Sequence, residues 1–157
     1  MKSLTEQLAT YKQQHTNRMN RLTHYFGIPM IIFSLLMLLN WISIDIATKW
    51  QISFAWIFLI GTLAYYFFLN VRLAVAATII MIPVAGIAMW MARPTPTAFS
   101  TSFFLLLFIG GWALQFLGHY FEKQKPAFFL ITQQLLIGPL FVLLEALEAL
   151  GVAKYVI

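Results

Sequence analysis

Hydrophobic residues fill five long stretches of the chain, and polar residues gather in the short segments between them. The stretches without a charged residue cover residues 22–44, 50–71, 73–92, 94–121 and 126–144. Each is close to the length of about 20 apolar residues that an α-helix needs to cross a bilayer. The pattern predicts an all-α, polytopic transmembrane helical bundle with about five membrane segments, folded as a single domain over residues 1–157.

The polar N-terminal segment has a different periodicity. Ser3 and Glu6 fit a capping box at the start of a helix. One face of the segment carries, at helical spacing, Leu4, Leu8, Tyr11 and His15. The spacing predicts an amphipathic helix over residues 3–16 that lies on the membrane or on the bundle. A polar stretch at 16–21 separates this helix from the first span.

Glycine and proline residues suggest where the spans begin and bend. Gly27 and Pro29 mark the mouth of the first span, and residues 45–51 make a short loop after it. Gly138-Pro139 interrupts the last span and predicts either a kink or a re-entrant pair of half-helices. Three small residues of the fourth span allow close helix approach: Gly110, Gly111 and Gly118. The expected spans cover residues 28–44, 52–70, 73–92, 99–118 and 127–150.

Composition excludes several classes of protein. The chain is 61% hydrophobic and 10% charged, whereas soluble domains carry about 25% charged residues. It has too few charges to cover a water-facing surface, which argues against a soluble enzyme or a disordered chain. It has no cysteine, which excludes a disulfide scaffold and thiolate chemistry. The basic residues are scattered at the ends of apolar stretches, so we expect no nucleic-acid partner.

The distribution of basic residues predicts an orientation. With five spans, one side receives seven of them: Lys2, Lys12, Arg18, Arg21, Arg72, Lys123 and Lys125. The other side receives three: Lys49, Arg93 and Lys154. The positive-inside rule then puts the N-terminus in the cytoplasm. The expected location is the endoplasmic reticulum for a eukaryotic protein and the inner membrane for a bacterial one.

Three histidines are the candidate chemical groups, and the topology puts His15, His24 and His119 on the same side. Asn20 lies four residues before His24, on one helical face; Gln115 and Glu122 flank His119 in the same way. Imidazole is a common ligand of iron and zinc. The alternative is a set of interfacial histidines that cap helices and meet lipid headgroups.

Helix geometry sets a condition for a shared metal site. Nine residues of continuous helix would put His15 and His24 on opposite faces, about 13.5 Å apart along the axis. The two can share a metal only if the helix breaks between them, and the polar stretch at 16–21 is a plausible break.

Two acidic residues have open roles. Glu122 is a metal ligand, a partner that orients an imidazole, or an ion-pair partner of Lys125. Glu145 is functional, or it marks the emergence of the last helix into water together with Glu148.

Two polar blocks carry a family resemblance. Tyr11, His15, Asn20-Arg21, His24 and Gly27-Ile28-Pro29 resemble the N-terminal signature of the Mpo-type 2-hydroxy-fatty-acid dioxygenases. The segment QFLGHYFEKQKPA at 115–127 resembles the second block of that family, and Gly138-Pro139-Leu140-Phe141 with Glu145 resembles a third.

The resemblance implies an iron(II)-dependent dioxygenase that converts a 2-hydroxy fatty acid and O2 to a fatty acid one carbon shorter, with a place in sphingolipid degradation. It implies that His15, His24 and His119 bind iron, or zinc, and that Glu122 belongs to the catalytic set. Residues that would support the ligands are Asn20, Gln115 and Glu145. Membrane lipids would surround the protein, and the oligomeric state is left open.

Two other functions compete with the dioxygenase. A non-catalytic membrane scaffold or lipid-binding protein would need no metal and none of the three histidines. A small transporter is less consistent with the sequence, because no ionisable residue lies in the middle of the first four spans.

Overall fold

The computed structural model describes the chain except for residues 1–2, 48–49, 94, 124–133 and 157. Helix α1 (Leu4–Gln13) is followed by α2 (Arg18–Asn40) and by an antiparallel hairpin of β1 (Ser43–Ala47) and β2 (Trp50–Ser53). The remaining elements are α3 (Phe54–Leu69), α4 (Val71–Ala92), α5 (Ala98–Glu122), α6 (Gln134–Ala149) and a short 3-10 helix, η2 (Ala153–Tyr155).

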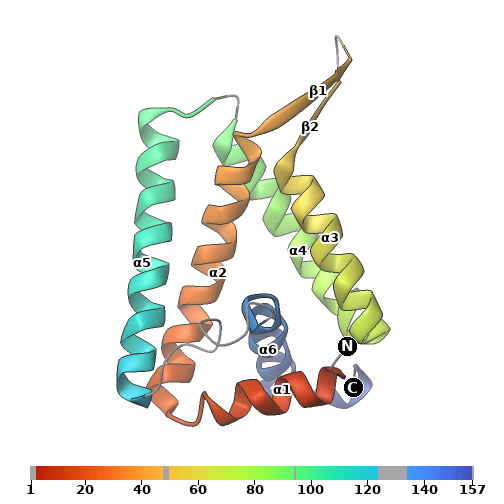
Figure 1. Ribbon diagram of the computed structural model, residues 1–157, viewed down its shortest axis with the longest axis vertical. Helices are drawn as coiled ribbons and strands as arrows, with labels where there is room; N and C mark the ends of the chain where they lie inside the picture. Colours follow the sequence, from red (N-terminus) through yellow and green to blue (C-terminus); the bar gives the residue numbers. More distant parts are fainter. Residues whose placement is uncertain (1–2, 48–49, 94, 124–133, 157) are drawn as a thin grey trace.

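Helices α2 to α5 run alternately up and down, as Figure 1 shows. Helix α2 packs along α5, and α3 packs along α4. The two pairs approach each other near the hairpin and separate toward the opposite end (Figure 1). Helix α1 lies across that open end, and α6 fills the space between the pairs. The bundle therefore has a narrow hairpin end and a wide α1 end.

The contact between α2 and α5 depends on glycine. A Cβ atom on Gly27 would lie 3.0 Å from the carbonyl oxygen of Gly111, and a Cβ on Gly111 would lie 3.0 Å from that of Gly27. A Cβ on Gly118 would overlap the side chains of Thr23 and Asn20. The predicted close approach at Gly111 and Gly118 is confirmed, and it brings the two helices together nearly backbone to backbone.

The first apolar helix differs from the prediction at both ends. Helix α2 begins at Arg18 and ends at Asn40, so Gly27 and Pro29 lie inside it and do not mark its mouth. A proline inside a helix removes one backbone hydrogen bond, and packing of neighbouring helices in membrane proteins commonly compensates for the loss. The close contact with α5 at Gly27 supports the helix at this point.

The loop expected at residues 45–51 is part of the β-hairpin. Ile44 pairs with Ile52, and Ser43 pairs with Ser53. The isoleucines at 42, 44 and 46 alternate with polar or small residues, and this period of two is typical of a strand. The hairpin projects from the end of the bundle farthest from α1 (Figure 1).

The last helix does not cross the bundle. Helix α6 continues through Gly138 and Pro139 without a break, so two half-helices are not present in the described part of this segment. Leu135, near its start, lines a cavity with the histidines, and Glu148, near its end, pairs with Lys12 of α1. Both ends of α6 therefore lie at the α1 end, and the chain's C-terminus lies there too (Figure 1).

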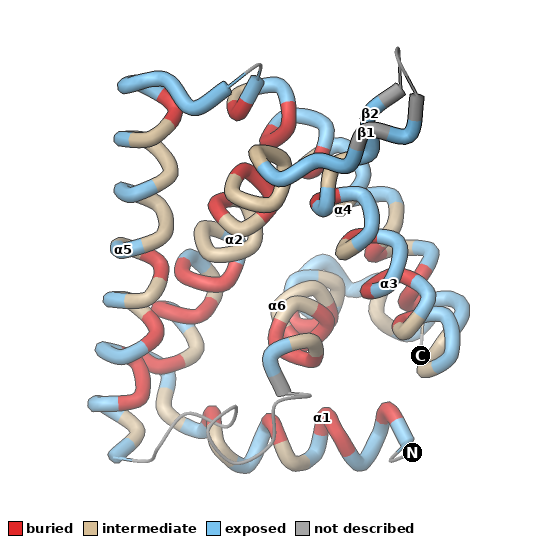
Figure 2. The backbone as a smooth tube through the Cα atoms, turned by 45° about the horizontal axis from the view of Figure 1, so that its top comes forward, coloured by how far each residue is buried: buried red, intermediate tan, exposed pale blue. Residues whose placement is uncertain are grey.

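Among the described residues, three helices are long and apolar enough to cross a membrane: α2, α4 and α5. Helix α3 is apolar but has only 16 residues. Helix α1 has the predicted capping box, and its buried side is turned toward α6 (Figure 2). That side consists of Leu4, Gln7, Leu8 and Tyr11.

Candidate metal centre

The three histidines meet at the α1 end of the bundle. His15 follows α1, His24 lies in the second turn of α2, and His119 lies in the last turn of α5. The three side chains are 3%, 1% and 5% exposed in that order. The ring centroids of His15 and His24 lie 4.6 Å apart, those of His15 and His119 5.2 Å, and those of His24 and His119 4.9 Å. One nitrogen atom from each ring lies within 4.8 Å of the others, so the three could hold a metal ion together.

The predicted break between His15 and His24 is present. Helix α1 ends at Gln13, and Asn17 caps α2 by accepting a hydrogen bond from the amide of Met19. Because the chain turns over residues 14–17, His15 is released from the helical phase of α2 and can face His24. The break lies at residues 14–17, earlier than the predicted stretch at 16–21, because α1 ends at Gln13, short of the predicted residue 16, and α2 already begins at Arg18.

Backbone carbonyl groups orient two of the rings. His15 Nδ1 lies 2.7 Å from the carbonyl oxygen of Tyr11, and His24 Nδ1 lies 2.8 Å from that of Asn20. A carbonyl can only accept, so both Nδ1 atoms carry the proton and both Nε2 atoms keep a lone pair. An Nδ1–H bond to a carbonyl is the usual arrangement of a metal-binding histidine.

The unpaired ring nitrogens fit a metal site. His15 Nε2 and His119 Nδ1 are buried and have no hydrogen-bond partner among the described residues. Burial lowers the pKa of His15, although the Tyr11 carbonyl and Glu122 act in the opposite direction. His15 is therefore neutral at pH 7, which is the form that binds a metal. The donor set suits iron or zinc.

Glu122 holds the break between α1 and α2. Its carboxylate accepts hydrogen bonds from the backbone amides of Thr16, at 3.0 Å, and Asn17, at 2.8 Å. It also accepts from the Thr16 hydroxyl and from Asn20 Nδ2, the latter at 3.0 Å. Asn20 in turn accepts from His24 through its carbonyl.

The position of Glu122 discriminates between its three possible roles. The carboxylate is not one of the groups that lie close enough together to share an ion, so the geometry favours an orienting role over direct ligation. The proposed pairing with Lys125 falls outside the described residues.

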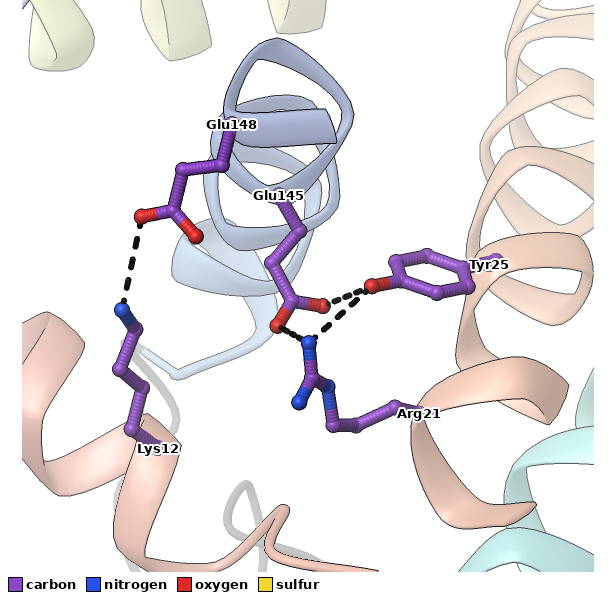
Figure 3. Close-up of polar contacts among 5 residues, drawn as sticks. All are labelled: Lys12, Arg21, Tyr25, Glu145 and Glu148. Carbon is purple, nitrogen blue, oxygen red and sulfur yellow. Dashed lines mark hydrogen bonds and ion pairs between the residues drawn. The ribbon is translucent and has the colours of Figure 1, made fainter. Parts of the chain in front are cut away.

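Glu145 belongs to a separate polar cluster between α2 and α6 (Figure 3). It accepts a short hydrogen bond from the Tyr25 hydroxyl and forms an ion pair with Arg21. Its side chain is only 5% exposed, so it does not mark the emergence of the helix into water. Glu148 is half-exposed and pairs with Lys12 at 3.6 Å (Figure 3).

A cavity of about 80 Å³ opens beside the histidines. Gln115 lines it, and its Nε2 atom is buried without a hydrogen-bond partner among the described residues. The rest of the wall is mostly apolar and includes Ile28, Ile31, Trp112, Leu135 and Pro139. A polar donor in a mostly apolar cavity that three imidazoles also line is typical of a small-molecule site.

The sequence missed some of the residues that build this site. Tyr11, which the sequence placed on the same helical face as His15 without a role at the site, stacks on His15 with ring centroids 4.0 Å apart. Its position four residues earlier was a usable signal. Thr16 and Asn17 bind a carboxylate more than 100 residues away in the chain. Tyr25 binds Glu145 over a similar separation. For these long-range partners no local pattern exists.

Comparison with known proteins shows which family the chain belongs to. A family model described as 2-hydroxy-palmitic acid dioxygenase Mpo1-like matches residues 1–150. The chain belongs to the Mpo1-like family. It is 31% identical over 150 residues to the 2-hydroxy-palmitic acid dioxygenase MPO1 of Saccharomyces cerevisiae, which covers 94% of this chain and 82% of the yeast protein. No solved structure gives a significant match. The family expected from the polar blocks is thus confirmed.

Proposed function

We propose that this Mpo1-like protein is an iron(II)-dependent dioxygenase that shortens 2-hydroxy fatty acids by one carbon. The observation that carries the proposal is the convergence of three buried histidines beside a mostly apolar cavity, two of them with unpaired ring nitrogens. Membership of a family named for 2-hydroxy-palmitic acid dioxygenase supplies the substrate class. One 2-hydroxy acid and one O2 balance as the shortened acid, CO2 and water.

Each group at the site has a role in this proposal. His15, His24 and His119 hold the iron, which supplies the redox chemistry that O2 requires. Tyr11 and Asn20 fix two of the rings through their carbonyl groups, and Glu122 holds the turn that carries His15. Gln115 Nε2 donates a hydrogen bond to an oxygen of the substrate. The apolar wall keeps bulk water away from the reacting carbon.

The charge of the site favours an anionic substrate. Three neutral imidazoles leave both positive charges of an iron(II) ion uncompensated, which is costly in a buried site. The nearby carboxylates have other partners: Glu122 is bound by the turn at Thr16, and Glu145 is paired with Arg21. The carboxylate of a 2-hydroxy acid would neutralise part of this charge.

The proposed orientation keeps the α1 end in the cytoplasm. Described basic residues at that end are Lys12, Arg18, Arg21, Arg72, Lys123 and Lys154, whereas Arg93 lies at the hairpin end. The return of α6 moves Lys154 to the basic side, which increases the asymmetry. By the positive-inside rule the metal centre faces the cytoplasm. The membrane would be that of the endoplasmic reticulum in a eukaryote or the inner membrane in a bacterium.

Metal analysis and turnover test the function together. Protein purified without oxygen should contain about one iron per chain, and it should consume O2 when given 2-hydroxypalmitate. His119→Ala should lower metal content and turnover about 100-fold or more, because one of three ligands is lost. Tyr120→Ala, at the exposed neighbouring position, is the control and should change neither.

Two results would contradict the proposal. Full metal content and activity in His119→Ala would refute the three-histidine site. A wild-type protein without a transition metal, together with three His→Ala variants that all behave like the wild type, would favour the alternative function of a membrane scaffold or lipid-binding protein. Activity with zinc alone would correct the identity of the metal.

A further inference from the structure

A second, larger cavity lies between α2, α4 and α6. Its volume is about 230 Å³. Its wall is formed by apolar side chains, among them Met81 and Val84 of α4 and Leu143 of α6. A cavity of this size without charged lining residues is suited to an apolar ligand rather than to ordered water.

The apolar cavity adjoins the histidine cavity. Both are lined by Ile28 and Ile32 of α2 and by Pro139 of α6. Along α6, Leu135 and Gly138 face the histidine cavity, whereas Leu143 and Ala146 face the apolar one. Ala146 follows Pro139 by seven positions, which corresponds to about 10.5 Å along the helix. The two cavities therefore follow each other in a line that starts at the histidines.

The far side of the apolar cavity reaches the protein surface. Ile80 of α4 and Ala146 of α6 both line the cavity, and both are exposed. Ile80 belongs to a helix that is long and apolar enough to cross a membrane, so an opening beside it would face lipid. A linear, amphipathic molecule could enter there from the bilayer with its tail still in contact with lipid.

We propose that the apolar cavity between α2, α4 and α6 binds the acyl chain of the substrate, with the polar end at the histidines and the tail directed to Ile80 and Ala146. The identity of the polar end rests on the proposed function. The position of the chain rests on the shared walls of the two cavities. Side-chain size at Val84 and its neighbours then limits which acyl chains are bound.

A photo-crosslinking probe tests the position of the chain without turnover. The probe is a 2-hydroxy fatty acid with a diazirine in the middle of its chain, added without oxygen to the full-length protein in lipid nanodiscs. Peptide mapping should find the label on α4 and α6 at the cavity wall, displaced by 2-hydroxypalmitate. Label found only at lipid-facing positions such as Val75, which is 45% exposed, would overturn the proposal.

A matched pair of variants on α4 sharpens the test. Val84→Phe fills part of the cavity, and displacing about two buried methylenes should weaken labelling roughly tenfold. Val75→Phe makes the same change on the exposed face and should leave labelling unchanged. Val84→Ala, which enlarges the cavity, should retain labelling and guards against misfolding of the larger substitution. Equal labelling of Val84→Phe and wild type would overturn the proposal.

The result separates this inference from the dioxygenase function. Labelling at the cavity wall without any O2 consumption would support the acyl-chain cavity and refute the enzyme. Turnover of 2-hydroxypalmitate with labelling confined to lipid-facing residues would support the enzyme and refute the cavity. In active protein, Val84→Phe should lower turnover of long-chain 2-hydroxy acids more than that of short-chain ones.

Discussion

The two ends of the bundle differ in where their polar residues lie. At the hairpin end, Thr97 and Ser100 cap the start of α5, and the indole of Trp41 donates to the carbonyl of Ala92. At the α1 end, polar side chains are buried within the packing: His15, His24, His119, Asn20, Gln115 and Glu145. Helices are capped at both ends, and at the α1 end buried polar side chains also surround a cavity.

Unpaired buried atoms reinforce the contrast. Among the described residues, the hairpin end has one such atom, Ser53 Oγ. The α1 end has five, which belong to Gln14, His15, Asn20, Gln115 and His119. A buried polar atom without a partner costs about 1–3 kcal/mol, so a cluster of them indicates a place where another molecule completes the bonds. The contrast between the two ends supports the proposal of a binding site at the α1 end.

The largest effect that would sharpen this contrast is expected at Glu122. Glu122→Gln weakens the hydrogen bonds that hold the turn at Thr16 and Asn17, so His15 loses its fixed position. We expect metal affinity to fall about 10- to 100-fold, as for other residues that support metal ligands. Metal titration of the purified variant measures the change.

The matched change at the hairpin end is Thr97→Ala. It removes the cap of α5 and should cost about 1 kcal/mol of stability without changing metal affinity. If Thr97→Ala weakened metal binding as much as Glu122→Gln, the two ends would not be functionally distinct.

An effect on stability rather than on metal affinity is expected from glycine packing. Gly118→Ala places a methyl group against Thr23 and Asn20, so α5 must shift away from the histidine end of α2. Overpacking of this kind costs about 1–3 kcal/mol, and thermal unfolding in detergent should detect it. Gly86→Ala, nearer the hairpin end of α4 and with no atom within 4 Å of the added carbon, should stabilise its helix by about 0.5–1 kcal/mol. If Gly118→Ala and Gly86→Ala both lowered the unfolding temperature, the bundle would be sensitive to larger residues at any glycine, and the close contact at Gly118 would not be the cause.

The smallest effect is a dependence of stability on pH in the metal-free protein. Because burial lowers the pKa of His15, the folded state binds its proton less readily than the unfolded state does. The contribution of neutral His15 to the free energy of unfolding is complete above its ordinary pKa of 6.5. This contribution is lost as the pH falls below that value. The unfolding temperature should be higher at about pH 7.5 than at about pH 5.5. The metal-free His15→Gln variant should show a smaller difference, and an unchanged difference would contradict the assignment to His15.

Much of the α1 end was predictable because its signals are local. The Ser3 capping box and the spacing of Tyr11 and His15 follow from helical periodicity. The need for a break between His15 and His24 follows from the same periodicity, and the structure has it. The predicted mouth at Gly27 and Pro29 was wrong because packing on α5 supports a continuous helix there. The hairpin was missed, although the alternation of isoleucines at 42–46 indicated it.

The sequence by itself determined the apolar helices, the family, and the placement of all three histidines at one end of the bundle. The helices and the placement of the histidines depend on hydrophobic length and on periodicity within single segments, whereas the family follows from the residues of the polar blocks. Only the tertiary structure decided that one nitrogen atom from each of the three rings lies within 4.8 Å of the others, that Glu122 holds the turn, and that α6 returns to the α1 end. These features depend on which faces of distant helices pack together, and that choice is made by contacts such as Gly27 on Gly111. Contacts between residues so far apart in the chain leave no local pattern to read.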